Sequence, residues 1–227
     1  MRVGFIGLGN VGSKLAGSLL RNGFDLVVRD LDRTAAAALE AQGAGWADSP
    51  AEMAATADMV ITCLPSPAAS AAVMEAGDGI LAGLAARTGH GSDGEPPIWA
   101  EMSTTDEAEV RRLAGLVAAA GGAAVDCPVS GGCHRAATGN ISIFAGCDRA
   151  TFERALPALT AMGRNILHAG PLGSASILKV VTHCARCGGS DRCCRAYFPA
   201  ETRRWREPRP GSRDAPGQRR LRQRRGA

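Results

Sequence analysis

A strand that runs directly into a glycine-rich turn opens the chain and restricts its fold more than any other feature. Residues 2–7 read Arg-Val-Gly-Phe-Ile-Gly, and the glycines at 7, 9 and 12 then follow in the order G-x-G-x-x-G before an amphipathic stretch. In such a strand–turn–helix, the glycines permit a tight turn, close approach of the backbone to a pyrophosphate, and close packing of helix on strand. The pyrophosphate lies on free N–H groups at the helix N-terminus. We therefore predict a dinucleotide site formed by Gly7, Leu8, Gly9, Asn10, Val11 and Gly12.

An acidic residue ends the second predicted strand, residues 24–30. Asp30 follows Gly12 by 18 residues, which is where an acid hydrogen-bonds the adenine ribose hydroxyls of a bound dinucleotide. Its charge would repel a 2′-phosphate, so the sequence favours NAD as the cofactor. NADP stays possible because Arg29 and Arg33 flank the acid.

Strand-like and helix-like segments alternate over the first 170 residues. Alternation with helices of about 10–15 residues is typical of a parallel sheet joined by right-handed crossovers. We predict helix starts at Thr104, from a capping box with Glu107, and at Asp148 as an N-cap. The predicted fold is α/β, with a Rossmann-type, doubly wound parallel sheet. Its strands are predicted at residues 2–7, 24–30, 45–47, 58–65, 98–102, 123–128, 140–146 and 164–170.

Three separated motifs, in this order, point to one family. They are "GFIGLGNVG", "DCPVSGGCHRAATGN" at residues 126–140, and "GPLGSASILK", which ends at Lys179. Together they resemble the β-hydroxyacid dehydrogenase family, and the second motif is more similar to its 3-hydroxyisobutyrate dehydrogenase branch than to the larger 6-phosphogluconate dehydrogenases. The resemblance covers residues 1–182. It implies an NAD(P)-dependent oxidoreductase that acts on a small β-hydroxy acid or on the corresponding semialdehyde.

The resemblance also implies roles for individual residues. Ser130, Gly131 and Gly132 match the loop that holds the substrate carboxylate, and such glycines expose backbone amides to an anion. The segments that line the cofactor near the strand ends are matched by Leu64, Pro65, Ser103 and Thr104.

Lys179 matches the catalytic lysine of the family and is one of two lysines in the chain, with Lys14. An ammonium can stabilise and protonate a developing alkoxide. Because a free lysine has a pKa of about 10.4, we expect burial beside the cofactor to lower it. Four residues later, the substrate-binding asparagine of the family is replaced by His183, which could donate a hydrogen bond in its place.

The chain changes character after residue 182. We divide it into an NAD(P)-binding domain at 1–170, the start of an interdomain helix at 171–182, and a poorly ordered tail at 183–227 that is rich in Arg, Pro and Cys. A shifted reading frame or a mis-joined exon would explain the tail. Two alternatives are a basic arm and a zinc site of Cys184, Cys187, Cys193 and Cys194. We expect the chain to lack the all-α C-terminal domain of the family, which usually forms its homodimer, and the alternative function is therefore a catalytically silent dinucleotide-binding fragment.

Charge and hydrophobicity exclude other classes of protein. Residues 1–182 carry 13 basic and 18 acidic residues, whereas residues 183–227 carry 13 basic and 4 acidic ones. The mildly acidic body therefore predicts no nucleic-acid partner. We also expect no metal site. No run of 18 apolar residues and no leader segment is evident, which predicts a cytoplasmic protein without a membrane span. The body cysteines are expected to be small, buried and reduced: Cys63, Cys127, Cys133 and Cys147.

Overall fold

The computed structural model describes residues 1–87, 89, 91 and 94–186, with side chains described as far as residue 182. Residues Met1–His183 form one compact unit, and the fold below is that of this unit. The strands are β1 (Arg2–Ile6), β2 (Asp25–Arg29), β3 (Gly45–Trp46), β4 (Met59–Thr62), β5 (Ile98–Glu101), β6 (Ala123–Asp126), β7 (Val129–Ser130), β8 (Ile141–Gly146) and β9 (Gly163–Gly170). The helices are α1 (Gly12–Arg21), the 3-10 helix η1 (Arg33–Ala36), α2 (Ala37–Glu40), α3 (Pro50–Thr56), α4 (Pro67–Glu75), α5 (Ile80–Ala86), α6 (Glu107–Ala119), α7 (Gly132–Ala137), α8 (Arg149–Met162) and α9 (Ser174–Arg186).

The sheet confirms the predicted Rossmann-type fold. Its first six strands lie in the order β3-β2-β1-β4-β5-β6, and each neighbouring pair is parallel. This is the doubly wound order in which a dinucleotide binds at the carboxyl ends of the strands, where the strand order reverses. The strand order reverses between β1 and β4, so the turn after β1 lies where a dinucleotide would bind.

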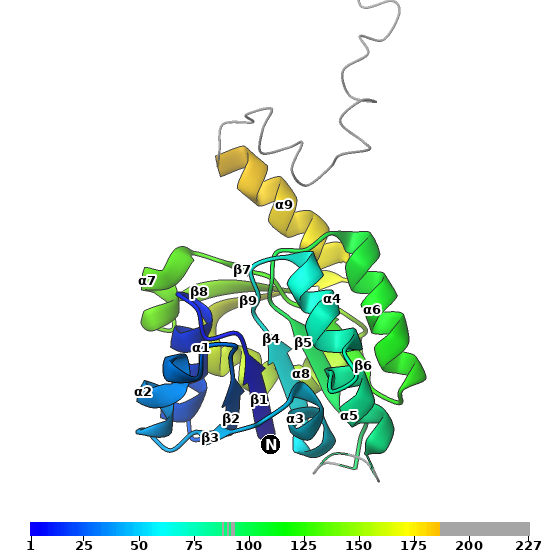
Figure 1. The fold of residues 1–227 in the computed structure, drawn as a ribbon. Coiled ribbons are helices and arrows are strands. Elements are labelled where there is room, and N and C mark those ends of the chain that lie inside the picture. Colours follow the sequence, from blue (N-terminus) through cyan, green and yellow to red (C-terminus); the bar gives the residue numbers. More distant parts are fainter. Residues whose placement is uncertain (88, 90, 92–93, 187–227) are drawn as a thin grey trace, which may run out of the picture. The chain divides into compact units, whose positions relative to one another are not determined.

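The far side of the sheet is not parallel, which corrects the prediction. Strand β8 runs antiparallel to β6 and β7, and β9 runs parallel to β8 (Figure 1). Val129 pairs with Ile143, and Ser130 pairs with Ser142, so the chain leaves β7, turns through the short helix α7 and returns along β7 as β8. The alternation of strand and helix does not distinguish this reversal from a crossover, and a two-residue strand gives no pattern of its own.

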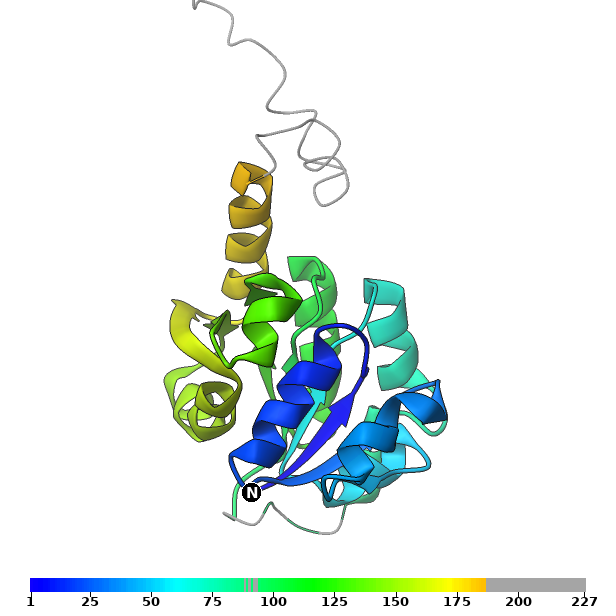
Figure 2. The ribbon, with the colours of Figure 1, turned by 90° about the vertical axis from the view of Figure 1, so that its left-hand side faces the viewer.

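Helices cover both faces of the sheet (Figures 1 and 2). One face packs on α1, α2, α7 and α8 through a core that includes Phe5, Leu15 and Phe152. The other packs on α3, α4, α5 and α6 through a core that includes Met53 and Trp99. With apolar side chains buried on both faces, the central strands read as continuous hydrophobic runs.

The helix starts show which sequence signals were sufficient. The Asp148 carboxylate accepts a hydrogen bond from the Thr151 N–H at 2.9 Å, as predicted for the N-cap of α8. The capping box at Thr104 was wrong, because the Asp106 carboxylate accepts from the Glu109 N–H at 2.8 Å and caps α6 instead. Three further helices were not predicted, α3, α5 and α7. Helix α3 carries its own signal, since Ser49 caps it directly before a proline at the first helical position.

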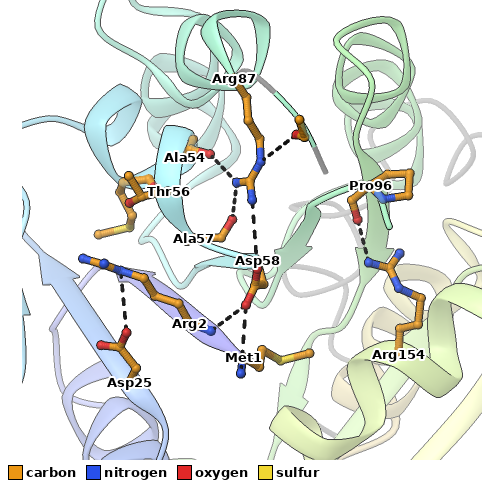
Figure 3. Close-up of polar contacts among 12 residues, drawn as sticks. Met1, Arg2, Asp25, Ala54, Thr56, Ala57, Asp58, Arg87, Pro96 and Arg154 are labelled. Atoms are coloured by element: carbon orange, nitrogen blue, oxygen red, sulfur yellow. Dashed lines mark hydrogen bonds and ion pairs between the residues drawn. The ribbon is translucent and has the colours of Figure 1, made fainter. Parts of the chain in front are cut away.

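A charged cluster lies at the amino-terminal ends of β1 and β4, opposite the glycine turn (Figure 3). The Asp58 carboxylate, directly before β4, accepts the Arg2 N–H at 2.7 Å and lies 4.0 Å from both the N-terminal amine and the Arg87 guanidinium. Arg87 also donates to the Ala54 and Ala57 carbonyls at 3.2 and 2.6 Å. These contacts join α3, α5 and the start of β4, so we interpret this cluster as structural.

The structure bears on two expectations, the absence of a membrane span and the start of the interdomain helix. By length and composition, the segment Pro67–Ala86 is apolar enough to cross a membrane, with a mean hydropathy of 1.2. It forms two helices, α4 and α5, separated by residues 76–79, and the absence of a membrane span stays a prediction. Helix α9 begins at Ser174 as predicted and extends past residue 182 to Arg186. The rest of the predicted tail, residues 187–227, lies outside the described part of the chain.

Candidate cofactor and active site

A cavity of about 920 Å³ lies at the carboxyl ends of the parallel strands. Residues that directly follow β1, β2, β4 and β5 line it, together with the segment around α7 and one side chain of α9. This volume is at the upper end of what small-molecule and cofactor sites occupy. Most of the predicted site residues line it: Gly7, Gly9, Asn10, Val11, Gly12, Asp30, Leu64, Pro65, Ser103, Thr104, Gly131, Gly132 and Lys179.

The glycine turn has the geometry of a pyrophosphate cradle. Gly7 has a φ of +98° and donates its N–H to the Arg29 carbonyl at 3.0 Å, which ties the turn to β2. A Cβ on Gly12 would lie 1.9 Å from the Gly7 carbonyl oxygen, so α1 packs against the turn as closely as its backbone permits. A Cβ on Gly9 would meet no protein atom within 4 Å. The space above Gly9 is therefore open to a ligand, as the predicted cofactor requires.

The carboxylate of Asp30 holds the turn in place. It accepts the Leu8 N–H at 2.6 Å and the Asp32 N–H at 3.0 Å, one on each oxygen. An ionised carboxylate accepts about four hydrogen bonds, so each oxygen keeps a lone pair for a ribose hydroxyl. The Leu8 side chain is buried and does not line the cavity, so its contribution is through the backbone.

Both arginines that flank Asp30 bond other groups, and Arg29 also lines the cavity. The Arg29 guanidinium donates to the Ala47 and Asp48 carbonyls at 3.2 and 2.5 Å. The Arg33 guanidinium makes a two-pronged ion pair with Glu40 and stacks 4.2 Å from the centroid of the Trp46 ring. Sequence reasoning identified these arginines but not the partners that hold them.

A buried acid, Glu101, links the carboxyl ends of β4 and β5 through Ser103. Sequence reasoning missed this residue. The Ser103 hydroxyl accepts the Leu64 N–H at 2.8 Å, and the Ser103 N–H donates to the Glu101 carboxylate at 2.7 Å. Burial raises the pKa of Glu101, and hydrogen bonds from neighbouring groups, led by the Ser103 side chain, oppose that rise only in part. Burial and the charge of Glu101 raise the pKa of the Cys63 thiol, which lines the cavity, to about 12.

Lys179 reaches the cavity from α9. Its Nζ donates to the Val129 carbonyl of β7 at 2.6 Å, and it lines the same cavity as Gly131 and Gly132. Ser130 lies half-buried in β7 beside these glycines but does not line the cavity. His183 lies one turn further along α9, and its side chain falls outside the described part of the chain.

The cysteines only partly match their prediction. Cys127 and Cys147 are buried and Cys63 is half-buried, but Cys133, in α7, is exposed, so the prediction for Cys133 was wrong. Cys133 directly follows the two glycines with positive φ, Gly131 and Gly132, at the start of α7. Among the described residues, no three His, Cys, Asp or Glu side chains gather in a way that could hold a metal ion.

Comparison with known proteins agrees with this geometry. Residues 2–170 match the model of a protein family described as the NAD-binding domain of 6-phosphogluconate dehydrogenase. The chain belongs to this family. Its cofactor is therefore of the NAD(P) type, and the glycine turn with the open space above Gly9 fits that cofactor.

Relatives of this NAD-binding domain include dehydrogenases of small hydroxy acids. It is 37% identical over 179 residues to an NAD-dependent L-serine dehydrogenase of Pseudomonas aeruginosa, covering 79% of this chain and 57% of that enzyme. It is 32% identical over 183 residues to a 2-(hydroxymethyl)glutarate dehydrogenase of Eubacterium barkeri, covering 81% and 58%.

A solved structure shares the fold as well. The crystal structure of a 3-hydroxyisobutyrate dehydrogenase from Salmonella typhimurium matches with a TM-score of 0.73 and 29% identity, covering 82% of this chain and 62% of that one. The chain thus spans less than two thirds of the length of each of these three relatives. The resemblance to the β-hydroxyacid dehydrogenase family is confirmed.

Proposed function

We propose that this chain is the cofactor-binding half of an NAD-dependent dehydrogenase that oxidises a small β-hydroxy acid or reduces the corresponding semialdehyde. The observation that carries the proposal is one shared cavity. The glycine turn lies on one side of it, and Lys179, Gly131 and Gly132 lie on the other. A proton-transfer group and anion-binding amides thus line the same cavity as the cofactor cradle.

The cofactor side would work through hydrogen bonds and close approach. The N–H groups at the start of α1 would receive the pyrophosphate, and Asp30 would bind the ribose hydroxyls with its remaining lone pairs. Arg29, which lines the cavity, and Arg33 already bond other groups, so a 2′-phosphate would meet the Asp30 carboxylate and would compete with those groups for either arginine. We therefore propose that NAD is preferred over NADP.

On the substrate side, we assign proton transfer to Lys179. A bound nicotinamide ring would supply the hydride acceptor. As the carbinol carbon loses its hydride, the neutral amine at Lys179 Nζ would take the hydroxyl proton, which leaves a carbonyl product and an ammonium. In the reverse direction, the ammonium would return that proton to the carbonyl oxygen. The amides of Gly131 and Gly132, with Ser130 beside them, would hold the substrate carboxylate, and the hydrogen bond from His183 to the substrate stays a prediction.

The proposal is tested by measuring cofactor binding and turnover separately on the full chain. NADH binding is followed by fluorescence, and NAD reduction is measured with 3-hydroxyisobutyrate, L-serine, 2-(hydroxymethyl)glutarate and glycerate. We expect Lys179→Ala to lower turnover by roughly 100- to 10,000-fold, the range for a general acid–base group, without weakening NADH binding. Arg149→Ala, which removes an exposed ion pair on α8, is the control and should change neither quantity.

Two outcomes would contradict the proposal. Turnover that survives Lys179→Ala would remove the lysine from the mechanism. NADH binding with no turnover of any substrate would support the alternative, a catalytically silent dinucleotide-binding fragment. The homodimer, the absence of nucleic-acid and membrane partners, and the cytoplasmic location stay predictions.

A further inference from the structure

Two contacts connect α9 to the same short segment of chain, residues 126–130, and only one of them involves the lysine. The Lys179 Nζ donates to the Val129 carbonyl, and the Asp126 carboxylate accepts two hydrogen bonds from Ser176. We propose that Asp126 is a positioning residue that fixes the first turn of α9 and thereby holds Lys179 at the cavity. This inference rests on the function proposed above for Lys179.

The anchor at Asp126 is buried and complete. Its Oδ2 accepts the Ser176 N–H at 2.8 Å, its Oδ1 accepts the Ser176 hydroxyl at 2.8 Å, and both side chains are almost fully shielded from solvent. Burial raises the pKa of Asp126, and hydrogen bonds from Ser176 and from the N–H groups of Ala175 and Gly173 oppose that rise. A carboxylate that accepts several free N–H groups at a helix start stabilises and orients that turn.

A missing side chain lets the helix approach this anchor. Gly146 of β8 pairs with Asp126, and a Cβ on Gly146 would lie 3.0 Å from the Pro171 carbonyl oxygen and 3.2 Å from the Ala175 N. The first turn of α9 therefore lies against the sheet backbone. A contact this close to two strands leaves the turn little freedom to shift.

The helix passes this constraint on to the lysine. Ser176 and Lys179 are three residues apart, so they lie on the same helix face, about 4.5 Å apart along the axis at 1.5 Å per residue. The segment that receives both contacts is itself held, because the Cys127 N–H donates to the Glu101 carbonyl at 2.8 Å and the Pro128 carbonyl accepts the Phe144 N–H at 3.2 Å. The two contacts therefore fix the position of Lys179 along the segment that leads into the substrate loop.

The test observes Lys179 directly in the full chain. With only two lysines in the sequence, protein labelled with 13C at lysine Cε gives two NMR signals, which Lys14→Arg assigns. We expect Ser176→Ala and, more strongly, Asp126→Asn to shift the Lys179 signal towards that of an exposed lysine. Acetylation of Lys179 relative to Lys14 should rise by roughly 10- to 150-fold, which is the loss expected from one hydrogen bond to a carboxylate.

The matched control is Asp148→Asn. Asp148 makes the same pair of bonds at the start of α8, to the N–H and hydroxyl of Thr151 at 2.9 and 2.6 Å. It should lower stability and leave the Lys179 signal unchanged. If Asp126→Asn does not fold, Ser176→Ala, which keeps the carboxylate, decides the question. An unmoved Lys179 signal in a folded, NADH-binding Ser176→Ala protein would overturn the inference.

The two proposals fail in different ways. The NMR and acetylation measurements need no turnover. If the chain is inactive but its Lys179 signal responds to Asp126→Asn, the anchor is supported and the proposed reaction is contradicted. If the chain is active, a positioning role predicts that Asp126→Asn lowers kcat while KM for NAD is unchanged. An active chain with unchanged kcat would overturn the anchor alone.

Discussion

The glycine turn allows one prediction to be worked out in detail, because two of its glycines differ in what a methyl group would meet. At Gly12 an added Cβ would lie 1.9 Å from the Gly7 carbonyl oxygen, whereas at Gly9 it would meet nothing within 4 Å. Gly9 is also not among the glycines with positive φ, so alanine can take its backbone conformation. Gly12→Ala should therefore damage the fold, and Gly9→Ala should damage only the binding of the cofactor.

The magnitudes follow from this geometry. Gly12→Ala forces helix and turn apart, and overpacking of this kind costs about 1–3 kcal/mol. For a unit of 183 residues, that corresponds to a fall in Tm of roughly 2–12 °C, at about 2–4 °C per kcal/mol. Gly9→Ala should leave Tm unchanged or raise it slightly, since alanine restricts the unfolded chain. A methyl group in the pyrophosphate space should raise the Kd for NADH at least about tenfold, or about 1.4 kcal/mol.

The assay pairs thermal unfolding followed by circular dichroism with NADH titration followed by fluorescence. Gly115→Ala is the control, because a Cβ there also meets no atom within 4 Å, and the residue lies in α6 away from the cavity. It should bind NADH normally. Normal NADH affinity in Gly9→Ala would refute the placement of the pyrophosphate, and an unchanged Tm in Gly12→Ala would refute the packing argument.

Three further predictions use other features of the cavity. Glu40→Ala should free Arg33 and lower the ratio of the Kd for NADPH to that for NADH by roughly two- to fivefold, the worth of an exposed ion pair; an unchanged ratio would show that Glu40 does not restrain it. Because the folded pKa of Glu101 is raised above its ordinary value of 4.5, stability should decline as pH rises from about 4.5 through the folded pKa. Glu101→Gln should remove that decline in Tm measured from pH 4 to 8, and a parallel curve would contradict it. With its pKa near 12, the Cys63 thiol should react with iodoacetamide at pH 8 far more slowly than exposed Cys133, and peptide mass spectrometry after brief labelling measures both.

The parallel half of the fold was predictable because its signals are local. Strands β1, β2, β4, β5 and β6 are largely apolar runs that end at a turn, and the G-x-G-x-x-G spacing fixes the first unit. The antiparallel pairing of β8 was not predictable, because it depends on β7, which has only two residues. The capping box failed for a related reason: Thr104 and Asp106 are both good N-cap residues, and tertiary contacts decide between them.

The candidate site divides in the same way. Glycines, Asp30 and Lys179 were recognisable from motif and position, and most of them line one cavity. Glu101 and the Asp126–Ser176 anchor were missed as functional groups, since their importance depends on partners far away in the sequence. Ser176 lies 50 residues from Asp126, and no periodic pattern links such positions. The Arg33 pair with Glu40 spans seven residues, and a prediction based on helical spacing of three or four residues does not find it.

The two halves of the cavity depend on different parts of the chain, and this decides how an inactive protein should be interpreted. The cofactor side is built from the ends of β1, β2, β4 and β5, which belong to the parallel sheet and its two cores. The lysine side depends on the first turn of α9, which is held to the sheet by the Asp126 carboxylate. Loss of the anchor can therefore silence Lys179 while the glycine turn stays intact. NADH binding reports on the sheet, and only a measurement on Lys179 itself reports on the anchor.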